Sequence, residues 1–122
     1  MLEPEGMTVQ LLVGEGAAAR AWYERLLGRP PDFRPFDDDS FLEWQFRPGF
    51  WELHVVESPE ADVRRGRVRI GVAHVDSARA ALRQVGFDVR ELEELPGVVR
   101  WCNLDDPWGN RLGLYQDLAR FP

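Results

Sequence analysis

An early segment of the chain, residues 7–13, alternates between apolar and polar side chains. Met7, Val9, Leu11 and Val13 would share one face of an extended strand. Alternation of this kind predicts a half-buried strand, because successive side chains point to opposite faces of a sheet. We therefore expect one face of this strand to pack on the core and the other face to be available to line a cavity.

Two later segments change to helical spacing. Residues 16–27 carry apolar side chains three and four positions apart, and Gly28 follows as a natural stop. After a predicted strand at residues 68–75, the same order returns, with Asp76 as the expected N-cap and Gly86 as the stop. Each segment is typical of an amphipathic helix that lies on a sheet.

The two halves of the chain repeat one layout. A Trp-bearing strand runs into a Pro/Gly turn and a second apolar strand around Trp44, and again around Trp101, 57 positions later. Glu15 and Asp76, which begin the helical segments, lie 61 positions apart. A period of about 60 residues indicates duplication. We therefore predict an α+β fold of two modules, each a strand, a helix and three strands (βαβββ).

Polar, Pro- and Gly-containing segments mark the connections. The segment from Ser58 to Gly66 indicates a linker, so we expect a first module at residues 1–58 and a second at residues 67–122 of a single domain. Pro30 and Pro31, with the acidic run 37–39, indicate a mobile connection before a strand at residues 41–46. Three consecutive carboxylates cannot converge on one ion from a tight turn, so a solvated turn is favoured over a metal site.

Composition narrows the function classes. The net charge is −6 and all 15 basic residues are Arg, which argues against nucleic-acid binding and excludes lysine-based chemistry. No apolar run approaches the roughly 20 residues of a membrane span. The N-terminus has no secretory pattern, so we expect a cytoplasmic protein without membrane contact. The single Cys102 cannot form an internal disulfide.

Three segments together resemble the vicinal oxygen chelate superfamily, which includes glyoxalase I, bleomycin-resistance proteins and extradiol dioxygenases. The segments read VQLLVGEGAAARAWYERLLG, VAHVDSARAALRQVGF and DDPWGNRLGLYQ, and they span nearly the whole chain. The resemblance implies two βαβββ modules, each curling a sheet around a concave pocket. It also implies a homodimer, because small members often pair and build their sites from both chains.

The resemblance implies four positions for a metal ion, on the first and last strands of each module. These positions correspond to Thr8, Glu52, Ile70 and Gly113. Only Glu52 has a side chain of the usual kind, so we expect no metal and no other cofactor. An alternative is an open three-ligand metal site of Glu52, His54 and His74. The competing interpretation is that the two histidines are partly buried hydrogen-bonding residues without a metal.

Polar and aromatic side chains expected on or beside the cavity are the candidates for ligand contact. They are Gln10, Trp44, Glu52, His54, His74, Trp101 and Tyr115. Glu52 would offer charge to a cationic ligand, and the two tryptophans would stack on a flat or cationic group. By alternation Trp51 faces away from Glu52 and is expected in the core.

These features favour a metal-independent small-molecule binding protein of the glyoxalase and bleomycin-resistance type. It would sequester an antibiotic or another planar or cationic ligand, and no catalytic residue is identified. One alternative is a metal-dependent lyase or dioxygenase that uses Glu52, His54 and His74. A second alternative is a structural dimer without a ligand.

Overall fold

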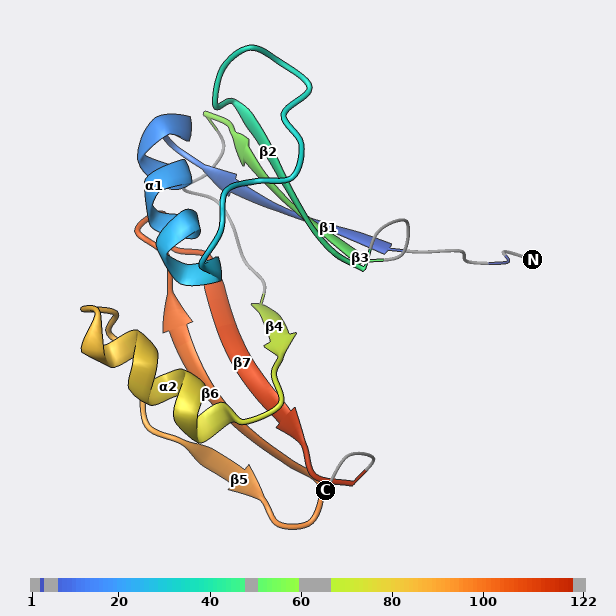
Figure 1. Cartoon of the computed structure of the whole chain (residues 1–122), viewed down its shortest axis with the longest axis vertical. Helices are drawn as coiled ribbons and strands as arrows, with labels where there is room; N and C mark the ends of the chain where they lie inside the picture. Colours follow the sequence, from blue (N-terminus) through green and yellow to red (C-terminus); the bar gives the residue numbers. More distant parts are fainter. Residues whose placement is uncertain (1–2, 4–6, 48–50, 60–66, 120–122) are drawn as a thin grey trace. The chain divides into compact units, whose positions relative to one another are not determined.

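The computed structural model describes residue 3 and residues 7–47, 51–59 and 67–119. The chain forms two compact units, Met1–Arg64 and Arg65–Pro122. Each unit has its own helix and sheet (Figure 1). Each unit also has its own buried apolar side chains.

The first unit consists of one helix on a three-stranded sheet (Figure 1). Its elements are β1 (Met7–Val13), α1 (Gly16–Leu27), β2 (Phe41–Arg47) and β3 (Trp51–Glu57). The strand order is β1-β3-β2, with β3 parallel to β1 and antiparallel to β2. The predicted early strand and first helix are confirmed, and Gly28 ends the helix with a φ of 75°.

The core of the first unit lies between α1 and one face of the sheet. Tyr23 of α1 and Trp44 of β2 are both 0% exposed, with ring centroids 6.0 Å apart. The Trp44 indole N–H donates to the carbonyl oxygen of Arg29 at 3.1 Å. Trp44 is therefore a core residue with its one donor satisfied, which corrects the prediction that it faces a ligand.

The second unit has the predicted order of a strand, a helix and three strands. Its elements are β4 (Arg67–Gly71), α2 (Val75–Gln84), β5 (Glu93–Leu95), β6 (Val99–Asp105) and β7 (Arg111–Asp117). The strand order is β4-β7-β6-β5, and β4 is parallel to β7. No helix among the described residues is long and apolar enough to cross a membrane.

The first unit has no counterpart of β5 among its described strands. In its place, Phe33 forms an isolated bridge with Glu43 of β2. Pro31 and Pro35 flank this bridge two positions away on either side, and proline has no N–H to give to a ladder. The second strand of the predicted βαβββ order, between the helix and β2, is thus reduced to one residue pair.

The helix of the second unit begins and ends differently from the prediction. The expected strand at residues 68–75 ends at Gly71, and α2 starts at Val75, so His74 rather than Asp76 occupies the N-cap position. Asp76 lies in the first turn, where its charge still suits the positive end of the helix dipole. The helix ends at Gln84, before Gly86, which has a φ of 100°.

Both helices receive their first cap from the last strand of their own unit. Neither N-cap residue makes a side-chain cap hydrogen bond. Instead the Gly16 N–H donates to Oε2 of Glu57 at 3.0 Å, and the Val75 N–H donates to Oε1 of Gln116 at 3.0 Å. Each contact spans 41 residues of sequence. The two contacts are analogous but not equivalent, because the parallel register relates Gln116 to Val55 rather than to Glu57.

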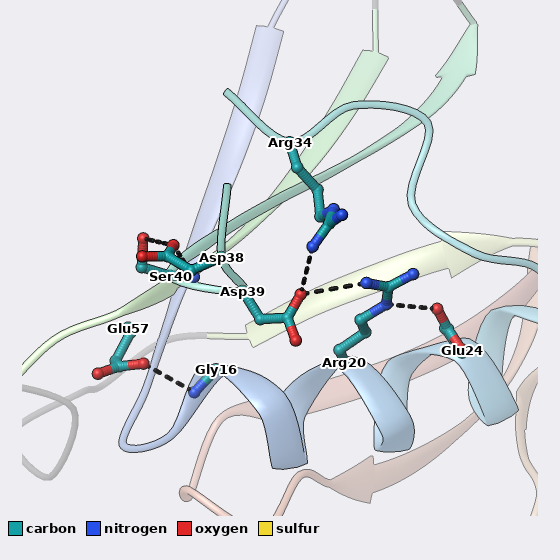
Figure 2. Close-up of polar contacts among 8 residues, drawn as sticks. All are labelled: Gly16, Arg20, Glu24, Arg34, Asp38, Asp39, Ser40 and Glu57. Atoms are coloured by element: carbon teal, nitrogen blue, oxygen red, sulfur yellow. Dashed lines mark hydrogen bonds and ion pairs between the residues drawn. The ribbon is translucent and has the colours of Figure 1, made fainter. Parts of the chain in front are cut away.

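The connection before β2 contacts α1 through Asp39 (Figure 2). Oδ1 of Asp39 accepts from Arg20 at 3.2 Å and from Arg34 at 2.9 Å. Glu24 and then Asp39 raise the pKa of Arg20 by hydrogen bonding. A Cβ on Gly16 would overlap the backbone oxygen of Asp39, so this close approach requires glycine. Asp39 therefore ties the connection to α1, whereas Asp37 and Asp38 are exposed, as expected of a solvated turn.

Trp51 lies outside the core, contrary to the alternation-based prediction. It is 48% exposed at the first position of β3. The other end of that strand, at Glu57, is where α1 begins. Trp51 lies on the face of the strand predicted by alternation. It is exposed because it lies at the end of β3 that is away from the start of α1.

The two tryptophans should respond differently to truncation. Trp44→Ala should lower the free energy of unfolding by about 3–5 kcal/mol, because it opens a cavity under α1. Trp51→Ala should lower it by less than about 1 kcal/mol, since the side chain is half exposed. Urea denaturation followed by circular dichroism measures both. Equal losses in the two variants would contradict this description of the core.

Candidate functional site

The face of the first sheet away from α1 carries polar side chains from all three strands. We call it the first open face, and by strand alternation it consists of Thr8, Gln10, Leu12, Phe41, Glu43, Gln45, Glu52, His54 and Val56. The register pairs Gln10 and Glu43 with His54 on either side, and Thr8 and Gln45 with Glu52. Three predicted site residues, Gln10, Glu52 and His54, thus lie together.

His54 is the centre of this face. Its Nε2 lies 3.1 Å from Oε1 of Glu43 and 3.4 Å from Oε1 of Glu52. Its Nδ1 lies 3.3 Å from Nε2 of Gln10, and its ring centroid lies 5.0 Å from that of Phe41. All of these contacts are satisfied when the imidazole proton is on Nε2 and Nδ1 accepts from the Gln10 amide.

Glu43 was missed by the sequence prediction. It lies between the buried residues Leu42 and Trp44, so alternation alone directs it to the first open face. Its Oε2 accepts from Nε2 of Gln45 at 2.8 Å, which fixes the carboxylate beside His54. A charged residue between two core positions of a strand was the signal in the sequence that could have identified Glu43.

The two carboxylates have no arginine partner among the described residues. The side chains of Glu43 and Glu52 are 13% and 21% exposed, and within the described part of the chain His54 is the only basic side chain within ion-pair distance of either. One ligand atom from each of these three residues lies within 4.8 Å of the others, so the group is compact enough to hold a cation. His74, the third member of the predicted metal trio, belongs to the second unit, where it is exposed at the start of α2.

The second sheet has a corresponding face away from α2. We call it the second open face, and it includes Arg69, Gly71, Glu93, Trp101, Asn103, Gly113 and Tyr115. The register pairs Trp101 with Tyr115, so these two predicted site residues are cross-strand neighbours. The guanidinium carbon of Arg69 lies 5.4 Å from the centroid of the Trp101 ring.

Solved structures similar to this chain share its architecture. A glyoxalase/bleomycin resistance protein from Catenulispora acidiphila is 26% identical with a TM-score of 0.75, covering 91% of this chain and 96% of that one. A lactoylglutathione lyase from Agrobacterium tumefaciens is 17% identical with a TM-score of 0.74, covering 95% and 96%. A bleomycin-binding protein in complex with bleomycin is 20% identical with a TM-score of 0.72, covering 91% and 97%. Neither protein-family models nor curated proteins give a match.

This chain has the glyoxalase/bleomycin-resistance fold. The superfamily and the α+β fold predicted from the motifs are thereby confirmed.

The register of the glyoxalase/bleomycin-resistance fold corrects one of the four implied metal positions. Thr8 pairs with Glu52, and Arg69 pairs with Gly113 in the same parallel arrangement 61 positions later. The counterpart of Thr8 is therefore Arg69 and not Ile70, which pairs with the buried Leu114. This position therefore has a cationic side chain, which repels a divalent ion.

The register also shows that Trp44 and Trp101 do not occupy equivalent positions in the two units. Glu43 pairs with His54 as Trp101 pairs with Tyr115, so Trp101 is the counterpart of Glu43. The counterpart of Trp44 is Cys102, and both are completely buried. Burial raises the pKa of the Cys102 thiol, so this side chain is unsuited to act as a nucleophile.

Proposed function

We propose that this chain is a cytoplasmic, metal-independent protein that binds a small molecule with a cationic group on an apolar or planar body. Glu43 and Glu52 would bind the cation, with His54 and Gln10 holding their geometry. The observation that carries the proposal is the pair of carboxylates on the first open face without an arginine partner among the described residues.

The chemistry of this pair favours a cation. Partly buried carboxylates are stabilised by an opposite charge, and two of them on one imidazole leave at least one negative charge unmatched. The neighbouring row of the same face, Leu12, Val56 and Phe41, is apolar and half-buried. An ammonium group attached to an apolar body would match both rows, with charge-assisted hydrogen bonds to the two glutamates.

Binding without a metal is supported by the positions that the resemblance assigns to metal ligands. With the register corrected, these are Thr8, Glu52, Arg69 and Gly113. Glycine has no donor, arginine is a cation, and threonine is a weak ligand, so only Glu52 would coordinate. A similar structure is a bleomycin-binding protein in complex with bleomycin, which supports sequestration of a small molecule.

A protonated aromatic amine should bind and depend on the glutamates. With 2-naphthylmethylamine as the probe, Glu43→Gln and Glu52→Gln should each weaken binding by roughly three- to thirtyfold, because each removes one charged acceptor. Isothermal titration calorimetry at low salt measures the affinities. Asp37→Asn, which makes the same charge change at an exposed loop residue of the same unit, should have little effect. If all three variants bound alike, the charge-based proposal would fail.

The purified protein should contain no stoichiometric divalent metal, because only one of the four implied ligand positions can coordinate. Elemental analysis of protein purified without chelator should find well under one metal per chain. About one zinc, nickel, iron or manganese per chain, lost in Glu43→Gln or Glu52→Gln, would overturn metal independence and favour the alternative of a metal-dependent enzyme.

We expect a homodimer. Each sheet has two edge strands, β1 and β2 in the first unit and β4 and β5 in the second, and a second copy can cover such edges. Light scattering at micromolar concentration should give a mass of two 14.1 kDa chains. A mass of a single chain would contradict this expectation.

A further inference from the structure

The second open face holds an arginine whose charge is not matched by any described carboxylate. Arg69 is exposed and has no carboxylate partner among the residues that the structure describes, although Arg90 and Arg100 of the same unit each hold at least one. Its guanidinium group lies over the ring of Trp101 instead. Stacking on an indole orients the planar group and leaves its edge N–H donors available.

Two aromatic side chains continue the surface beside Arg69. Trp101 is half-buried and its cross-strand partner Tyr115 is 36% exposed. Within the described residues, neither the indole N–H of Trp101 nor the hydroxyl of Tyr115 has a hydrogen-bond partner. The three side chains therefore present a flat apolar area together with several unused donors.

Glycines shape this surface. A Cβ on Gly113 would lie 2.9 Å from Cγ of Arg69 and 3.1 Å from Oδ1 of Asn103. A Cβ on Gly71 would lie 3.0 Å from the hydroxyl oxygen of Tyr115. The two glycines thus let Arg69 and Tyr115 lie close against the sheet. We call Arg69, Trp101 and Tyr115, with these glycines beneath them, the platform.

We propose that the platform is a second ligand subsite and that it binds an aromatic carboxylate. The guanidinium edge matches a carboxylate in a bidentate geometry, and an attached ring would pack on Trp101 and Tyr115. The inference deepens the proposed binding function by adding a subsite of opposite charge. The inference rests on the proposed function only in that a ligand binds to an open face. The platform residues all belong to the second unit and are separate from Glu43 and Glu52.

The preference for an aromatic acid follows from combining the charge with the flat surface. An isolated oxyanion such as acetate or inorganic phosphate would meet only the guanidinium group and the scattered donors, in competition with water. A ring on the same molecule adds contact area and excludes water from the ion pair, which strengthens it. The aromatic acid should therefore bind more tightly than either small anion.

The test uses one ring system with two opposite charges. Calorimetric titration of the full chain with 2-naphthoate should show binding that Arg69→Gln weakens by roughly five- to fiftyfold and Trp101→Phe by roughly two- to tenfold. Gly113→Ala should also weaken it, because the added methyl group displaces Arg69 from the indole. Binding of 2-naphthylmethylamine should be unchanged in Arg69→Gln, since its proposed site is Glu43 and Glu52.

Arg83→Gln provides the matched control, because Arg83 is an exposed arginine on α2 rather than on the sheet face. The inference is overturned if wild-type protein does not bind 2-naphthoate, if Arg69→Gln and Arg83→Gln bind it alike, or if acetate and phosphate bind as tightly. If the wild-type protein bound 2-naphthoate but not 2-naphthylmethylamine, the cation proposal would be refuted and the platform proposal would stand. Thermal melting of each variant shows that a loss of affinity is not a loss of fold.

Discussion

Parallel pairing of the first and last strands determines how each unit presents its side chains. The β1–β3 and β4–β7 pairs fix which residues stand beside one another, and the alternation of each strand then divides them between core and open face. Glu52 stands beside Thr8, and Gly113 stands beside Arg69, only because of this register. A slip of one residue would bury the charged residues and expose the core.

The sequence predicted what depends on local pattern. The first strand and first helix, the superfamily and the α+β fold follow from alternation, helical spacing and motif order. The wrong metal position at Ile70 and the false equivalence of Trp44 and Trp101 came from register across the repeat. The helices are offset by 59 positions between units and the parallel pairs by 61, whereas β2 and β6 are offset by 58. Two tryptophans 57 positions apart therefore fall on opposite faces, which spacing alone could not reveal.

Strand alternation brought three of the candidate residues to one face of the first sheet, but the prediction left out the charged residue that lies between two core positions. Gln10, Glu52 and His54 lie together as neighbours in the sheet, and Glu43 joins them from the adjacent strand. The two units have since diverged at equivalent places: Glu43 and His54 in one correspond to Trp101 and Tyr115 in the other. One scaffold thus presents an acidic surface in the first unit and an arginine–aromatic surface in the second.

The analogous capping contacts have a consequence for how each unit folds. Gly16 and Val75 begin their helices, yet the acceptors that satisfy them, on Glu57 and Gln116, are among the last residues of each unit to be synthesised. Closing a 41-residue loop must precede the full stability of the helix. Such non-local contacts slow folding, and they also tie the helix to the sheet, so that each unit gains or loses its structure as a whole.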